Sequence, residues 1–126
     1  MKFEHFALNV PDPRAMARWY IAQCGMTAAR AMEGAPYTHF LADSTGRVVM
    51  EIYSNPVCAT PDYARQHPLI FHVAFAVKNA GAERDRLVKA GATVVSDDRL
   101  PDGSHLVMLR DPWGVALQLC QRAKEM

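Results

Sequence analysis

Alternation of hydrophobic and polar positions marks the start of each half of the chain, near residues 3–10 and 69–77, and predicts a strand in each place. A segment with a partly apolar helical face follows each predicted strand. Residues that favour helix ends bracket both segments: Asp12 and Asn79 as N-caps, and Gly25 and Gly91 just beyond the last turn. The pattern therefore predicts a strand and then a helix at the beginning of each half.

Three short strands are expected after each helix, separated by turns rich in glycine, proline, serine and aspartate. Their ranges are 27–32, 37–42 and 47–53 in the first half, and 92–96, 104–110 and 115–121 in the second. Three prolines in residues 54–68 indicate a connection between the halves. We expect one α+β domain over residues 1–126, built from two βαβββ modules at about 1–55 and 68–126.

The two halves also match each other in sequence. With a shift of 67 residues, His5–Val10 falls on His72–Val77, and Val48–Tyr53 falls on Val115–Cys120. Self-similarity at a fixed period is typical of repeated structural units. We therefore expect two copies of one module, with equivalent residues at equivalent structural positions.

Four polar residues occupy matching places in this repeat. His5 and His72 share their strand faces with alanines, while bulky residues fall on the opposite faces, which the helices should cover. Glu51 and Gln118 each interrupt an apolar strand, and each follows the histidine of its half by 46 residues. If a pseudo-twofold axis relates the modules, the four side chains converge over a concave surface with a polar floor.

A metal site explains this constellation better than separate structural roles do. A single histidine on a strand is commonly a hydrogen-bonded core or rim residue, and a lone glutamate can protect a sheet edge. A buried, unpaired carboxylate is costly, however, and a divalent cation offsets that cost. Two imidazoles, a carboxylate and an amide oxygen suit Zn, Ni, Fe(II), Mn or Co. His5, His72 and Glu51 alone could form the two-histidine-one-carboxylate ligand set of a non-haem Fe(II) site.

Composition narrows the classes of partner. Of the 126 residues 50% are hydrophobic and 21% are charged, and the formal net charge is +1. This is an ordinary globular composition, with no reason to expect nucleic acid or an anionic membrane as partner. No apolar stretch reaches the length of a membrane span, and the N-terminus lacks the apolar core of a signal peptide. Three widely separated cysteines favour a reduced cytoplasm over a disulfide framework.

The chain resembles the vicinal-oxygen-chelate superfamily, which includes glyoxalase I, methylmalonyl-CoA epimerases, extradiol dioxygenases, fosfomycin-resistance enzymes and bleomycin-binding proteins. The resemblance covers nearly the whole chain and is specific for the superfamily, but it does not select one reaction. The segments that carry it are Phe3-Glu4-His5, Val10-Pro11-Asp12-Pro13, Trp19-Tyr20, Met50-Glu51-Ile52-Tyr53, Phe71-His72-Val73-Ala74-Phe75 and Asp111-Pro112-Trp113-Gly114.

The resemblance implies paired modules forming an open, cupped mixed sheet with helices outside. It implies one divalent metal ion held by His5, Glu51, His72 and the position of Gln118, and a homodimer. It also implies a small substrate that chelates the metal through adjacent oxygens. In glyoxalase I of the bacterial type the fourth ligand is usually glutamate, so Gln118 is a departure.

We expect a glyoxalase-like lyase or an isomerase or epimerase, with Glu51 as proton carrier, because an amide at position 118 cannot act as a base. The alternatives are an extradiol-type Fe(II) dioxygenase and a metal-free binding or resistance protein of the bleomycin type. Five further residues are weaker candidates for substrate contact, with structural roles as the competing interpretation: Asn9, Tyr53, His39, His105 and Arg110.

Overall fold

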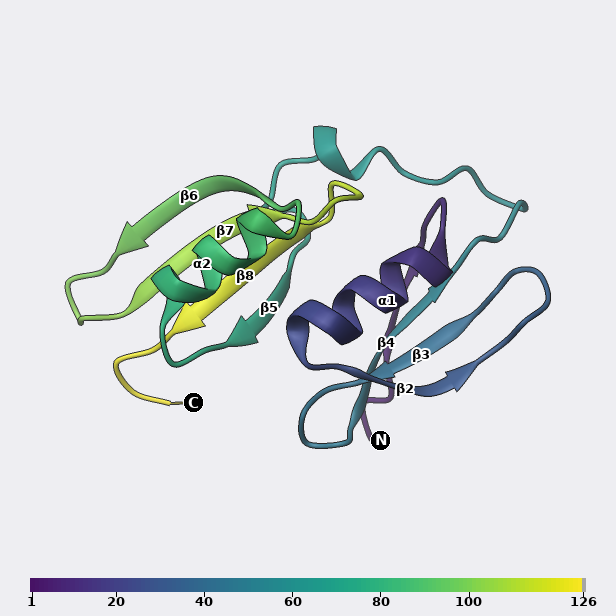
Figure 1. The fold of residues 1–126 in the computed structure, drawn as a ribbon, viewed down its shortest axis with the longest axis horizontal. Helices are drawn as coiled ribbons and strands as arrows, with labels where there is room; N and C mark the ends of the chain where they lie inside the picture. The colour runs from purple at the N-terminus through teal and green to yellow at the C-terminus, as the bar shows by residue number, and fades with distance from the viewer. Residues whose placement is uncertain (126) are drawn as a thin grey trace. The chain divides into compact units, whose positions relative to one another are not determined.

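The computed structural model describes residues 1–125, and each half has the order strand, helix and three strands (Figure 1). The first half contains β1 (Phe6–Asn9), α1 (Pro13–Cys24), β2 (Thr27–Ala31), β3 (His39–Ala42) and β4 (Val48–Tyr53). The second contains β5 (Val73–Ala76), α2 (Ala80–Lys89), β6 (Thr93–Arg99), β7 (His105–Arg110) and β8 (Ala116–Gln121), after a short 3-10 helix at Tyr63–Arg65. The predicted α+β fold with two βαβββ modules is confirmed.

The chain divides into two compact units, Met1–Pro61 and Asp62–Met126, and the boundary falls inside the predicted connection. The sheet of the first unit has the strand order β1-β4-β3-β2, and that of the second has the equivalent order β5-β8-β7-β6. In each sheet the first strand of the module pairs with the last in parallel, and the other neighbours are antiparallel. This common topology confirms the repeat that the sequence predicted.

Side-chain caps begin both helices where the sequence placed them. Asp12 accepts a hydrogen bond from the backbone N–H of Ala15 at 3.0 Å, and Asn79 accepts one from Ala82 at 3.0 Å. Each bond satisfies one of the N–H groups that the first helical turn leaves unpaired. The first helix ends at Gly25, whose φ of +65° is the left-handed conformation that glycine adopts most readily.

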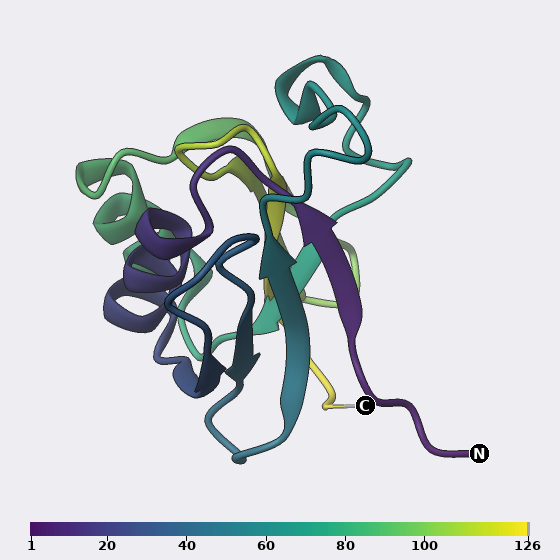
Figure 2. The same ribbon diagram turned by 90° about the vertical axis from the view of Figure 1, so that its right-hand side faces the viewer.

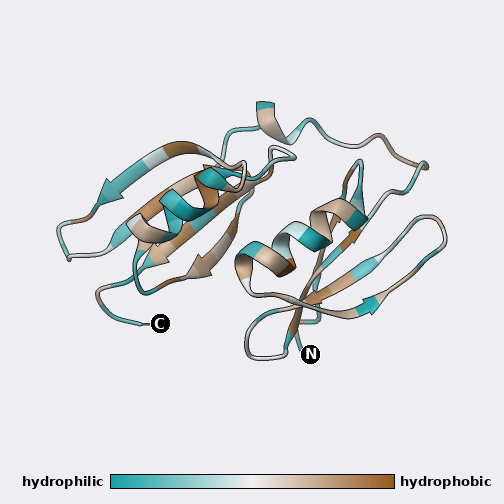
Figure 3. Cartoon of the chain, viewed as in Figure 1, coloured by the Kyte–Doolittle hydropathy of each residue, from teal (hydrophilic) through white to brown (hydrophobic). Residues whose placement is uncertain are grey.

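One helix covers one face of each sheet, and hydrophobic side chains fill the space between. Figure 2 shows α1 lying along one side of the first sheet, and Figure 3 shows hydrophobic and hydrophilic residues mixed along both helices, as expected for helices with one solvent face. The largest fully buried side chains of the first unit are Val10, Met16, Tyr20, Met26, Leu41, Met50 and Ile52, and those of the second are Leu87, Val107, Leu109, Val115 and Leu117. We call the opposite side of each sheet its open face.

The strand limits differ from the prediction by three or more residues in three places. The first and fifth strands begin at Phe6 and Val73, later than the predicted residues 3 and 69. The sixth strand continues to Arg99, whereas its predicted end was residue 96. Aspartate has a low propensity for strands. The additional residues of β6 nevertheless pair with β7, with Asp97 opposite Val107 and Arg99 opposite His105. Among residues 1–125, no helix is long and apolar enough to cross a bilayer.

Candidate metal centre

The open face of the first unit carries one imidazole and one carboxylate in direct contact. Ala7 lies opposite Glu51 in the parallel pairing of β1 with β4, and His5 precedes Ala7 by two positions. His5 Nε2 lies 3.0 Å from Glu51 Oε2. The Phe40 ring and the imidazole pack nearly perpendicular to one another, with ring centroids 5.6 Å apart. Strand pairing and this aromatic contact together fix the pair.

The second nitrogen of the same imidazole faces another acid. The Glu4 carboxylate contacts His5 Nδ1, although the two groups are not aligned for a hydrogen bond. Carboxylates therefore approach both ring nitrogens of His5, Glu4 at Nδ1 and Glu51 at Nε2.

The open face of the second unit carries the equivalent imidazole and amide. His72 Nδ1 donates a hydrogen bond to the Pro68 carbonyl at 3.0 Å, which leaves Nε2 as the unprotonated nitrogen of the neutral ring. Gln118 lies opposite Ala74 in the pairing of β5 with β8, as Glu51 lies opposite Ala7. Its Oε1 accepts a hydrogen bond from the Cys120 thiol at 3.3 Å.

The four donors are of the types that bind a divalent cation, and the separation of one pair also suits such an ion. Two ligand atoms about 2.1 Å from one cation and at a right angle lie about 3.0 Å apart, which is the separation of His5 Nε2 and Glu51 Oε2. A backbone acceptor that fixes Nδ1, as Pro68 does for His72, is the usual partner of a metal-binding histidine. Within residues 1–125 the structure brings no three His, Cys, Asp or Glu side chains together as a metal-binding group. Each unit by itself holds one donor pair.

Asn9, a weaker candidate for substrate contact, binds the backbone of its own unit. Its Nδ2 donates to the carbonyls of Asn55 at 3.2 Å and Cys58 at 3.0 Å, and its Oδ1 accepts from the Asn55 N–H at 2.8 Å. The side chain is buried. These bonds attach the segment after β4 to the end of β1, which is a structural role.

Arg110 also binds backbone in the structure. Its guanidinium donates to the carbonyls of Tyr63 and Gly114 at 2.9 Å and of Gln66 at 2.6 Å. The two segments approach so closely that a Cβ on Gly114 would lie 2.8 Å from the Ala64 nitrogen. Arg110 thus fastens the short 3-10 helix to the turn after β7.

The two histidines of the middle strands lie on the helix sides of their sheets. His39 is opposite Ile52, and His105 is opposite Gln121, so neither shares a face with Glu51 or Gln118. His39 Nδ1 donates to the Tyr37 carbonyl at 2.7 Å, and His105 is buried. Of the five weaker candidates, Tyr53 alone is on an open face without a hydrogen bond from its side chain within residues 1–125.

His105 belongs to an ion-pair network on the helix side of the second unit. Its Nε2 lies 2.6 Å from Asp97 Oδ1, and Arg84 of α2 pairs with the other carboxylate oxygen. The hydrogen bond from His105, and then that from Arg84, lowers the pKa of Asp97 below its ordinary value of 3.8. A carboxyl with a lowered folded-state pKa stabilises the fold above its unfolded pKa, and that contribution disappears as the pH falls through the folded pKa.

Replacement of Asp97 by asparagine should therefore lower the free energy of unfolding by about 1 kcal/mol at pH 7. The gap from the parent protein should close as the pH falls from about 4 toward 2, because the parent then loses the same carboxylate. Urea unfolding across this range measures both curves. The matched control is Asp98→Asn, since Asp98 contacts Ser96 and no cation within the described residues. A gap that stays constant with pH would contradict this interpretation.

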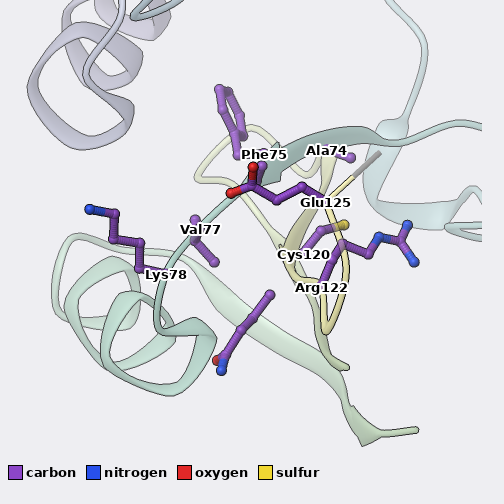
Figure 4. A pocket seen from close by; sticks show the side chains of 9 residues that line it. Ala74, Phe75, Val77, Lys78, Cys120, Arg122 and Glu125 are labelled. Carbon is purple, nitrogen blue, oxygen red and sulfur yellow. The ribbon is translucent and has the colours of Figure 1, made fainter. Parts of the chain in front are cut away.

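A row of residues that the sequence did not single out follows Gln118 along the open face of β8. Cys120 comes at the next alternate position and Arg122 one residue beyond the end of the strand, and Figure 4 shows their side chains and that of Ala74 extending to the same side. Burial raises the pKa of the Cys120 thiol, and the neighbouring Arg122 partly opposes that change. The sequence could have indicated both residues, because they are the second and fourth residues after Gln118, and alternate residues of a strand share one face.

The topology of the two modules is that of the vicinal-oxygen-chelate superfamily. The family model described as a glyoxalase-like domain matches residues 5–120, so the chain belongs to this family. Among curated proteins, none matches the chain.

Solved structures share the fold at low sequence identity. TnmS3, an antibiotic binding protein from Streptomyces sp. CB03234, has a TM-score of 0.71 and 18% identity, over 96% of this chain and 95% of that one. A glyoxalase-related enzyme from Fulvimarina pelagi has a TM-score of 0.69 and 19% identity, over 97% and 88%. A glyoxylase/bleomycin resistance protein/dioxygenase domain from Frankia sp. EAN1pec has a TM-score of 0.70 and 21% identity, over 96% and 97%.

Proposed function

We propose that the protein is a metal-dependent lyase or isomerase that binds one divalent cation through His5, Glu51, His72 and Gln118. The observation that carries the proposal is the contact of His5 Nε2 with Glu51 Oε2 at 3.0 Å on the open face. The equivalent positions of the other module hold His72, whose Nδ1 donates to the Pro68 carbonyl, and Gln118. The donor set comes either from one chain or from two chains of a homodimer, which we propose as the assembly.

The substrate in this proposal is a small molecule with adjacent oxygens. When bound, the cation supplies Lewis-acid stabilisation of negative charge that develops on these oxygens. His5 and His72 act as neutral nitrogen ligands; the Phe40 ring packs against the His5 ring, and the hydrogen bond to the Pro68 carbonyl fixes the orientation of the His72 ring. Ala7 and Ala74, which flank Glu51 and Gln118 on the neighbouring strands, are small and exposed and leave room for the substrate.

Glu51 is the proton carrier in this mechanism. It is the carboxylate of the donor set, whereas the Gln118 amide is not a base at neutral pH. One oxygen, Oε2, contacts His5, and Oε1 takes and returns the proton of the substrate carbon. The mechanism needs no other titratable group of the chain at the reacting carbon.

A metal-free binding protein is the second candidate. It is favoured by the likeness to TnmS3, whose name describes antibiotic binding, although that likeness extends to the fold alone. An extradiol-type Fe(II) dioxygenase is the third, supported by the name of the Frankia domain. Anaerobic loading with Fe(II), addition of a catechol and measurement of oxygen uptake separate the dioxygenase from the lyase or isomerase. We also propose the reduced cytoplasm as the compartment, consistent with three unpaired cysteines.

Metal titration tests the proposal directly. Protein purified without chelator and then stripped should gain thermal stability on addition of Ni, Zn, Mn or Fe(II). A cation at one hundred times its dissociation constant stabilises the folded state by about 2.7 kcal/mol, or roughly 10 °C in a domain of this size. If none of the four metals shifts the melting temperature, and elemental analysis finds no metal in the protein as purified, the metal-free binding protein is favoured.

A further inference from the structure

We infer that the substrate of this site carries an anionic group separated from its chelating oxygens by an apolar segment, and that Arg122 binds that group. The inference rests on the proposed function, because the metal site fixes where the chelating end lies. It concerns a part of the second unit that the proposed chemistry does not use.

The order of the polar side chains at the end of β8 indicates how a substrate would extend from the metal site. Gln118 and Cys120 occupy alternate positions of β8, and Arg122 follows one residue beyond the end of the strand. Gln118 Oε1 accepts a hydrogen bond from the Cys120 thiol at 3.3 Å, and Arg122 contacts the same thiol. A molecule that reaches from the metal ligand Gln118 to the guanidinium therefore passes the thiol.

A cavity of about 780 Å³ has Arg122 in its lining (Figure 4). The same lining includes Ala74, which lies opposite Gln118 in the sheet, and also Ala76 of β5 and Cys120. The two alanine methyl groups are apolar, and the thiol forms only weak hydrogen bonds, so this part of the lining favours apolar contact. This lining suits a hydrocarbon segment of the substrate.

Charge at the far end of the cavity selects an anion. Arg122 contacts the Cys120 thiol, and no carboxylate forms an ion pair with it within residues 1–125. The nearby acid Asp102, whose pKa is lowered first by its hydrogen bonds with Ser104 and also by the charge of Arg122, is bound by the backbone and hydroxyl of Ser104. Figure 4 shows Lys78 and Glu125, the other charged residues of the lining, extending away from the Arg122 side. A guanidinium in this setting matches a carboxylate or a phosphate.

Two matched chelators probe this arrangement. Suberic acid monohydroxamate and octanohydroxamic acid both bind metals through adjacent hydroxamate oxygens and have the same chain length. They differ at the far end, which is a carboxylate in the first and a methyl group in the second. Titration calorimetry of the metal-loaded protein should show the carboxylate compound binding about fivefold more tightly, the upper range for a solvent-exposed ion pair.

Arg122→Gln should remove that preference, whereas Arg99→Gln, which removes an exposed arginine of the same unit outside the cavity, should keep it. Higher salt should reduce the preference in the parent protein. Equal binding of the two hydroxamates by the parent protein, or an unchanged preference in Arg122→Gln, would overturn the inference and leave the metal site standing. A preference that depends on Arg122 but not on added metal would instead overturn the proposed function and keep the anion site.

Discussion

Replacing Glu51 by glutamine should lower turnover by about 10²- to 10⁴-fold at saturating metal, the usual contribution of a positioned proton carrier. The amide keeps the size of the side chain and one oxygen donor, so the loss reports the missing base. Exchange of a substrate carbon-bound proton for deuterium measures it, with hydroxyacetone and the hemithioacetal of methylglyoxal and glutathione as first substrates. A variant that holds metal and exchanges the proton at the parental rate would exclude the role of Glu51.

The repeat supplies a matched control for this variant. In the double variant Glu51→Gln/Gln118→Glu the carboxylate and the amide exchange modules, and the donor set is chemically the same as in the parent protein. If the two modules are equivalent, metal affinity should return to within about tenfold of the parent value. If metal affinity stays as low as in Glu51→Gln alone, positions 51 and 118 are not equivalent around the cation.

Removing either histidine ligand should lower the affinity for divalent metal by at least about 100-fold. Outer partners of metal ligands already contribute 10- to 100-fold, and a direct ligand contributes more. Competition with a chelator of known affinity measures the loss in His5→Ala and in His72→Ala. The matched control is His67→Ala, which removes an exposed imidazole that bonds the Leu69 N–H. Parental affinity in His72→Ala would show that the second module does not take part.

Most of the fold could be predicted because its signals are local. Asp12 and Asn79 cap the helices as expected, and the alternation of large and small residues gave the strand faces on which His5, Glu51 and Gln118 lie. The extension of β6 to Arg99 could not be predicted, because it depends on pairing with β7 and on contacts of Asp97 with residues outside its own strand. Tertiary pairing outweighed the low strand propensity of aspartate there.

The candidate site was predictable as far as the repeat specified it. The repeat gave the positions of both donor pairs, and the 3.0 Å contact of His5 with Glu51 follows from the parallel pairing of their strands. Roles for Asn9 and Arg110 could not be inferred, since both bind backbone carbonyls of segments distant in sequence. The sequence could not predict on which face of the sheet His105 lies, because both faces of β7 carry apolar residues and show no alternation of polar and apolar positions.

A crystal structure of the nickel-loaded protein, with anomalous scattering at the nickel edge, tests the central claim most directly. The proposal predicts one anomalous peak per site, within about 2.0–2.2 Å of His5 Nε2, a Glu51 oxygen, His72 Nε2 and Gln118 Oε1. The four ligands come from one chain or from two chains of a dimer. A peak bound by His5 and Glu51 without His72, or separate peaks at the two donor pairs, would contradict it.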